Sequence, residues 1–396
     1  MFAVYLLSMG GLALSALCML RLSPSLAALV EVDGKRFASL DGLRGLLASG
    51  VFIHHAAVYQ VYASEGVWRD PSDRLLRSLG GDCVNVFFMI TGFLFWRKAL
   101  LGGGRLARAE LLRSRVRRVM PAYLVVATLV IAVALAQTRF TLRESPGEIA
   151  LEVTRWLAGG LLGAPPINGV GAVPINCGVT WTLQYEWCFY LALPLLAWFA
   201  SDRRAPLLLG IFFALWGAAR WLRLELPFSP GSLSRFLMGM LVAHLVVRWP
   251  DLAQLRSRAV SSLLAAALAA SIALPIPRAV LGAVLWLSFA AVIYGNDFFG
   301  LLTSRWMTLL GHVSYSIYLI HGLVLSLSVL GLQQLTSVAS LSSPAYWVFI
   351  GGVGALMLWA SMGLYRLAEA PFIAAPHART KAPARAPRAA AEQPSP

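Results

Sequence analysis

Charged side chains are scarce in this chain. Asp, Glu, Lys and Arg make up only 13% of its 396 residues, whereas roughly 25% is usual in soluble domains. Hydrophobic residues reach 58%, which is more apolar surface than a soluble core can hide. Short alternating segments, which would indicate an outer-membrane barrel, are also lacking. These absences exclude a soluble globular protein and indicate helices that satisfy their own backbone hydrogen bonds within a bilayer.

Acidic residues are the scarcer kind of charge, with 18 Asp and Glu against 33 Lys and Arg, which gives a net charge of +15. In a soluble protein such an excess would suggest nucleic acid, but the chain carries no RNA- or DNA-binding motif. In a membrane protein, Lys and Arg gather in cytoplasmic loops and set the orientation. We therefore expect membrane lipids around the chain and no nucleic-acid partner.

Cysteine is also rare: the chain has four, and none forms a CxxC or a Cys/His metal spacing. No bound metal is expected. Cys83 and Cys177 both fall on the predicted outer side, which is oxidising in bacteria. They are either bridged or unpaired packing residues, and the sequence leaves this open because it shows no Cα separation.

Apolar runs long enough for a spanning helix recur along the whole chain. They predict an all-α, polytopic membrane bundle of about eleven transmembrane helices. The expected spans are residues 1–20, 43–62, 82–101, 119–136, 180–199, 206–222, 232–248, 259–274, 278–296, 311–332 and 344–366.

The charges of the loops orient this bundle. Segment 97–118 holds eight Lys and Arg against Glu110 alone, so it is expected to be cytoplasmic. Segments 63–81 and 137–179 balance basic against acidic residues, and 333–343 carries no charge. With eleven spans the basic loops all fall on one side. This predicts a membrane protein with its N-terminus outside and its C-terminus cytoplasmic.

Two segments are not expected to span. The stretch from Glu148 to Leu162 is amphipathic and predicts a helix that lies in the membrane interface. Residues 374–396 are rich in Ala, Pro and Arg. That composition cannot build a core, and it predicts a disordered, basic cytoplasmic tail.

Ionisable residues within spans are costly and therefore mark candidate functional sites. Arg44 and His55 lie eleven residues apart, which on a helix is about 20° from eclipsed and roughly 16 Å of rise. His54 lies about 80° from that face. A functional role for this pair competes with a structural one, in which Arg44 snorkels to the surface and His55 bonds a neighbouring helix.

Six segments together carry a resemblance to a known family, whose first core helix has an Arg and a His at this same spacing. In chain order they are LDGLRG (40–45), NVFFMITGFLF (85–95), RSRVRRVMPAY (113–123), WTLQYEWCFYLALPLL (181–196), VSYSIYLIH (313–321) and YRLAEAPF (365–372). Departures from the family pattern stand at Asn85, Thr91, Ser114 and Ala370. Over residues 36–373 the chain resembles the integral-membrane acyltransferase-3 family, the bacterial O-acyltransferases that modify surface polysaccharides and related acceptors.

The resemblance implies a ten-helix acyltransferase core over residues 36–373, preceded by an extra transmembrane helix and a linker over residues 1–35. It implies an enzyme that transfers groups other than aminoacyl groups, with O-acetyl transfer as the family default. The donor would be a cytoplasmic acyl-CoA such as acetyl-CoA, used as a co-substrate with no permanently bound cofactor. The acceptor would be a hydroxyl of a glycan or glycan-lipid on the outer side.

Catalytic roles are expected for His55, Arg44 and Glu186. A hydroxyl that attacks a thioester needs a base of near-neutral pKa, which histidine supplies. His55 either deprotonates the acceptor directly or forms an acyl-imidazole. Arg44 would pair with the donor or hold Asp41, and Glu186 would orient the acceptor hydroxyl or His55, or else form a structural hydrogen bond.

The remaining candidates divide between the two substrates. The basic cluster that precedes the fourth span has the sign and the side to bind the phosphates of the donor, although it also serves as a topology signal. Donor binding is expected at Arg115, Arg118, Asp41 and Glu369. On the acceptor side we expect Tyr190, Trp181, Tyr318 and His321, for each of which packing is the alternative.

A membrane transporter of polysaccharide or lipid-linked intermediates is the alternative function. Many transporters are built from internal repeats with paired broken helices. The sequence shows neither feature, so an enzyme is the favoured interpretation.

Overall fold

The computed structural model describes residues 2–30, 37–201, 204–223 and 229–374. Over these residues the chain is helical and forms no strand, apart from an isolated bridge between Ile167 and Val170. The predicted all-α class is confirmed. Residues 31–35 of the predicted linker and residues 375–396 of the predicted tail lie outside the described residues.

The described residues form helices joined by connecting segments of different lengths. In chain order they are α1 (Phe2–Leu22), α2 (Pro24–Leu29), α3 (Ala38–Glu65), α4 (Arg74–Leu101), α5 (Arg108–Gln137), α6 (Pro146–Leu157), α7 (Val173–Asn176), α8 (Trp181–Leu196), η1 (Ala197–Phe199), α9 (Ala205–Trp221), α10 (Pro230–Arg248), η2 (Ala253–Arg256), α11 (Arg258–Ala273), α12 (Arg278–Ile293), α13 (Arg305–His312), α14 (Ser314–Gln333), η3 (Val338–Ser340), α15 (Ser343–Leu364), the π-helix η4 (Tyr365–Glu369) and α16 (Ala370–Ala374).

Five helices in the described part of the chain are long and apolar enough to cross a bilayer. They occupy Arg74–Leu101, Arg108–Gln137, Gly231–Arg248, Ser314–Gln333 and Ser343–Ile373. The chain is therefore a multi-pass membrane protein. Each of the eleven segments expected to span also lies on a helix among the described residues, but the number that crosses the bilayer remains a prediction.

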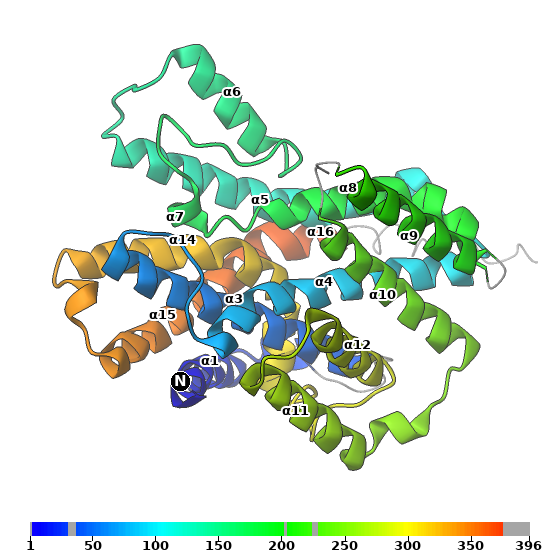
Figure 1. Ribbon diagram of the computed structural model, residues 1–396. Coiled ribbons are helices and arrows are strands. Elements are labelled where there is room, and N and C mark those ends of the chain that lie inside the picture. Colours follow the sequence, from blue (N-terminus) through cyan, green and yellow to red (C-terminus); the bar gives the residue numbers. More distant parts are fainter. Residues whose placement is uncertain (1, 31–36, 202–203, 224–228, 375–396) are drawn as a thin grey trace, which may run out of the picture.

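Helix α3 lies at the centre of the contacts between elements. It packs against α4, α13 and α14, and also touches α1 and α12. Figure 1 shows α4 and α14 running across the view, with α5 and α8 above them and α3 crossing at a slant. Residues from α3, α4, α5, α8 and α14 therefore share one interior.

Glycines explain how α3 and α13 meet. A Cβ on Gly42 would overlap the carbonyl of Leu302, and one on Gly311 would overlap the carbonyl of Asp41. A Cβ on Gly45 would lie 2.5 Å from the carbonyl oxygen of Met307. Only glycine permits such approach of backbone to backbone. These contacts account for the glycines of the LDGLRG segment and fix the start of α3.

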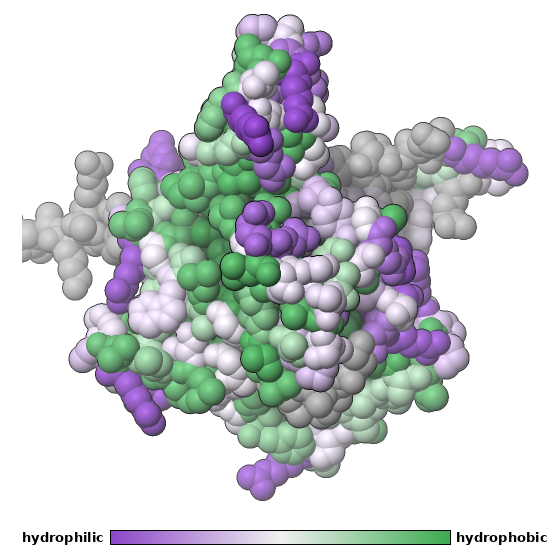
Figure 2. Space-filling view, turned by 90° about the vertical axis from the view of Figure 1, so that its left-hand side faces the viewer, coloured by the Kyte–Doolittle hydropathy of each residue, from purple (hydrophilic) through white to green (hydrophobic). Residues whose placement is uncertain are grey.

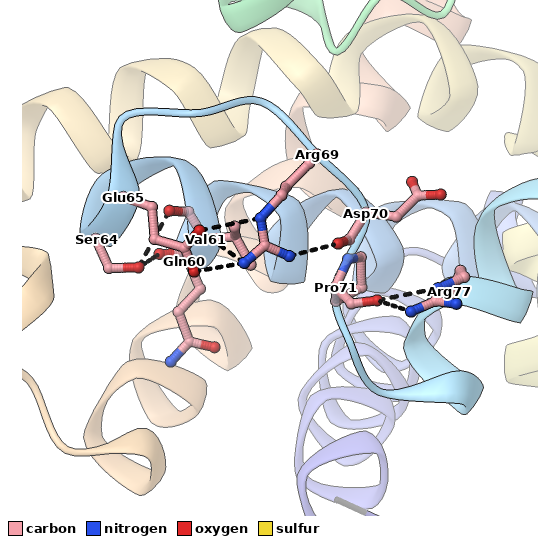
Figure 3. A network of polar contacts seen from close by, with 8 residues as sticks. All are labelled: Gln60, Val61, Ser64, Glu65, Arg69, Asp70, Pro71 and Arg77. Atoms are coloured by element: carbon pink, nitrogen blue, oxygen red, sulfur yellow. Dashed lines mark hydrogen bonds and ion pairs between the residues drawn. The ribbon is translucent and has the colours of Figure 1, made fainter.

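The loop between α3 and α4 is held by the opposite charges that the sequence balances there (Figure 3). Arg69 forms a bidentate ion pair with Glu65, with its shortest contact at 2.6 Å. The guanidinium of Arg77 donates at 3.1 Å to the carbonyl of Pro71. These contacts hold the connection between α3 and α4 in place.

The amphipathic stretch expected near residue 148 forms α6, which projects from the bundle (Figure 1). Figure 2 looks onto this end and shows many hydrophilic residues on the projection. Ser145 and Glu148 form a reciprocal capping box at its start. Trp156 anchors its far end, because the carbonyl of Trp156 accepts from the Tyr123 hydroxyl at 2.8 Å.

The disulfide considered between Cys83 and Cys177 is wrong, because all four cysteines are free. The thiol of Cys83 lies against Gly50 of α3. Cys177 lies instead beside two histidines, His55 and His321. The two thiols therefore meet different neighbours, although both are buried.

Candidate active site

A pair of histidines brings α3 and α14 together. His55 Nδ1 lies 3.0 Å from His321 Nε2, and the ring centroids are 5.0 Å apart. The adjacent His54 points elsewhere: its Nδ1 lies 2.7 Å from the carbonyl oxygen of Leu76, and its ring rests on Gly80 of α4. The helical spacing therefore separates the two neighbouring histidines as predicted.

Backbone carbonyls fix the tautomers of the pair. Nδ1 of His55 lies 3.1 Å from the oxygen of Val51, and Nδ1 of His321 lies 3.1 Å from that of Ile317. A carbonyl oxygen can only accept, so in the neutral rings both Nδ1 atoms carry the proton. His321 Nε2 then accepts from His55 Nδ1–H. The Nε2 lone pair of His55 is left available to take a proton.

A cavity of about 390 Å³ lies between α4, α5, α8 and α14, and Arg44 of α3 also lines it. Along α4 its lining extends from Lys98 to Val84, which corresponds to about 21 Å of helix rise. The rest of the lining is mainly apolar and aromatic, with Thr91, Glu110, Ser114, Arg115, Arg118, Thr182, Glu186, Tyr190, Ser314, Tyr315 and Tyr318 as polar members. The shape is that of a passage along the helices.

The end of the cavity between α4 and α5 is basic. Lys98, Arg115 and Arg118 line it. The guanidinium of Arg115 lies over the rings of Phe95 and Tyr190, with 4.9 and 5.9 Å to the centroids. These stacked contacts hold its charge at the cavity wall.

Two acidic residues stand beside this basic end. The Arg118 guanidinium lies 4.0 Å from the carboxylate of Glu369, which is only 1% exposed and accepts from the Ser316 hydroxyl at 3.0 Å. Arg44 lies 3.6 Å from Asp41, one turn earlier in α3. Arg44 thus lines the cavity, and its ion pair with Asp41 helps to fix the position of its guanidinium.

Glu186 lies along the cavity wall. Its carboxylate accepts from the Tyr190 hydroxyl at 2.7 Å and from the Thr91 hydroxyl at 3.4 Å. Of the alternatives considered for Glu186, orientation of His55 is not seen, since His321 takes the position beside that imidazole. Glu186 and Tyr190 share one helix face, as their spacing predicts.

Tyr318 links the cavity to the histidine pair. It lines the cavity, its hydroxyl bonds that of Thr182 at 2.7 Å, and its ring centroid lies 6.1 Å from that of His321. Trp181 is different: it is 44% exposed and packs edge-on against Phe88. The cavity wall does not include Trp181 among its described residues.

Comparison with known proteins identifies the family. A family model described as an acyltransferase domain matches residues 37–366. The chain belongs to the acyltransferase-3 family. The predicted family and enzyme class are confirmed: the protein is an acyltransferase that moves groups other than aminoacyl groups.

The acyltransferase also resembles a curated protein. It is 27% identical over 261 residues to the "Exopolysaccharide production protein ExoZ" of Rhizobium meliloti (strain 1021). That alignment covers 63% of this chain and 78% of the relative. No solved structure matches the acyltransferase.

Cys177 is a residue of this acyltransferase site that sequence reasoning did not place there. Its thiol and one ring nitrogen each from His55 and His321 all lie within 4.8 Å of one another. The fold achieves this because α7 packs on α14, where a Cβ on Gly322 would overlap the backbone of Asn176. No local spacing between these three residues signals the contact.

Proposed function

We propose that this chain is an inner-membrane O-acyltransferase, with acetyl as the favoured group. It would move the acyl group from cytoplasmic acyl-CoA to a hydroxyl of a glycan or glycan-lipid on the outer side. The observation that carries this proposal is the cavity that runs from Arg115 and Arg118 to Tyr318, beside the His55–His321 pair.

The basic end suits the donor. Guanidinium groups bind phosphates with paired, charge-assisted hydrogen bonds, and Arg115 and Arg118 both face the cavity. Arg44 adds a third positive charge to the same wall. The apolar and aromatic lining beyond them suits the uncharged arm and the acyl group of a CoA thioester.

The histidine pair suits the transfer itself. His55 Nε2 takes the proton of the acceptor hydroxyl while the oxygen attacks the thioester carbonyl. The C–S bond then breaks, and the leaving thiolate receives that proton. His321 keeps Nδ1 of His55 as the donor, which leaves Nε2 free to act as the base. A route through an acyl-imidazole would use the same Nε2.

A polysaccharide acceptor is favoured by the relative whose name refers to exopolysaccharide production. We place the acceptor at the end of the cavity near Thr182, because the loop charges assign the start of the span 180–199 to the outer side. This arrangement uses the eleven-span topology, with one helix before a ten-helix core over residues 36–373.

The proposal is tested with purified protein in lipid nanodiscs. Labelled acetyl-CoA is supplied with a crude glycan-lipid fraction, and label in the fraction is measured. Mass spectrometry of envelope glycans with and without the gene identifies the acceptor. Two results together would contradict the proposal. Every glycan would keep its acyl groups without the gene, and the purified protein would neither transfer nor hydrolyse acetyl-CoA.

A further inference from the structure

The three donor atoms at the His55–His321 pair form a set that suits zinc. Two imidazoles and one thiol are ligands that Zn²⁺ favours, and a tetrahedral ion takes nitrogen at about 2.0–2.1 Å and sulfur at about 2.3 Å. Such bonds place the donor atoms roughly 3.3–3.6 Å apart. The three donor atoms all lie within 4.8 Å of one another. Small side-chain shifts are enough to bring them to these distances.

The surroundings of both rings match those of metal-binding histidines. Such a histidine usually donates its other ring N–H to a carbonyl or carboxylate, which fixes the ring. Nδ1 of His321 faces the carbonyl of Ile317, and Nδ1 of His55 faces that of Val51. These two hydrogen bonds are a separate observation from the proximity of the three donor atoms. They orient the Nε2 lone pairs of His55 and His321.

The third ligand comes from a well-held segment. Cys177 is 6% exposed and has a left-handed backbone with φ of 59°. The hydroxyl of Tyr59, from α3, bonds the carbonyl of Pro174 in the preceding turn.

We propose that His55, His321 and Cys177 together bind one Zn²⁺ ion, and that this ion switches off acyl transfer. On binding, the Cys177 thiol releases its proton to solvent and its sulfur joins the ion. If His55 binds through Nε2, that lone pair is occupied. If it binds through Nδ1, the ring proton moves to Nε2. Either way the nitrogen that the proposed reaction needs as a base is lost.

Only the inhibitory consequence rests on the proposed function, so binding is measured first and without any substrate. The full chain is purified with a tag that lacks histidine, treated with a chelator and titrated with Co²⁺ as a spectroscopic probe. A thiolate-to-Co²⁺ absorption band that Zn²⁺ abolishes is expected in the wild-type protein. Cys177→Ser should lose the band and weaken Zn²⁺ binding by more than about 100-fold, since even outer contacts change affinity by about 10–100-fold.

Cys83→Ser is the matched control, because Cys83 is also a buried free cysteine but packs against Gly50. It should keep the band. An unchanged band in Cys177→Ser, or no band in the wild-type protein, overturns the metal site.

A measurement on the unaltered chain covers the case in which Cys177→Ser does not fold. Zn²⁺ should protect Cys177 from alkylation, as read by mass spectrometry, and should leave the rate at Cys83 unchanged. Equal alkylation of Cys177 with and without Zn²⁺ overturns the site.

The inhibitory part is tested by transfer assays in which each protein is compared with its own metal-free rate. Zn²⁺ should inhibit the wild-type protein and Cys83→Ser, and a chelator should restore both. Cys177→Ser should need at least about tenfold more Zn²⁺. Zn²⁺ that binds without lowering the rate overturns the inhibitory role and leaves the proposed function intact.

Discussion

The two ends of the cavity draw their residues from the chain in different ways. At the basic end, Arg115 and Arg118 come from one helix and Lys98 from the helix just before it. Beyond the other end, next to Tyr318, lie His55 and His321, which are separated by 266 positions in the sequence and are not part of the cavity lining. The proposed donor site is thus assembled locally, whereas the proposed proton chemistry depends on tertiary packing. Changes at the two ends should therefore separate donor binding from turnover.

The largest expected effect is that of His55→Ala. Removing a general base costs about 10²–10⁴-fold in rate, so transfer should fall to background while expression and membrane insertion stay normal. His54→Asn is the matched control. His54 contacts α4, and the Asn side chain keeps a donor for the Leu76 carbonyl. Wild-type turnover in His55→Ala would remove the histidine pair from the chemistry.

The next effect concerns His321 as a positioning residue. His321→Ala removes the acceptor for His55 Nδ1–H, and one hydrogen bond is worth about 0.5–1.5 kcal/mol, so kcat should fall up to about tenfold with KM for acyl-CoA unchanged. His321→Gln places a side-chain oxygen close to the position of the lost His321 Nε2, where it can accept from His55 Nδ1–H, and should recover part of kcat. Equal loss in both variants, or a change confined to KM, would speak for a packing role alone.

Arg115→Ala should act at the other end only. A charge-assisted hydrogen bond to phosphate contributes about 1.5–3 kcal/mol, and solvent reduces this at the partly exposed mouth. We expect the Kd for CoA to rise by about tenfold and kcat at saturation to stay the same. Arg113→Ala is the control, since this exposed arginine of α5 lies outside the cavity wall. Equal Kd values in the two variants would reduce Arg115 to a topology signal.

The smallest effect should come from Ser145→Ala, far from both ends. The lost N-cap should destabilise α6 locally by about 1 kcal/mol, seen as faster amide exchange with unchanged Kd and kcat. Hydrogen bonds from the side chain and backbone of Ser145 hold the pKa of the Glu148 carboxyl below its usual range. The stabilisation of α6 by the ionised Glu148 carboxylate is therefore complete above the pKa that this carboxyl has in the unfolded chain. It is lost as pH falls through the lower pKa of the carboxyl in the folded protein. A large loss of turnover would show that α6 takes part in the site.

The sequence predicted the helical class and the separation of His54 from His55, because both follow from periodicity within one helix. It also singled out Arg115, Arg118, Glu186 and Tyr190, and the structure brings their side chains to one cavity. It did not predict that His321 is the partner of His55, and it left open whether Cys177 is bridged to Cys83 or unpaired. Those contacts depend on how α7 and α3 each pack on α14, which no local pattern encodes.

The contact between α3 and α13 sets a length. Gly45 meets the carbonyl of Met307 and Gly311 meets that of Asp41, so no side-chain layer separates the two backbones there. This contact fixes the start of α3, on which Arg44 and His55 lie about 16 Å apart along the helix axis. In the proposed reaction, a donor that contacts both residues carries its reactive carbonyl on an arm of comparable length. An acyl phosphate, with its anionic group bonded directly to the carbonyl, is too short to contact both.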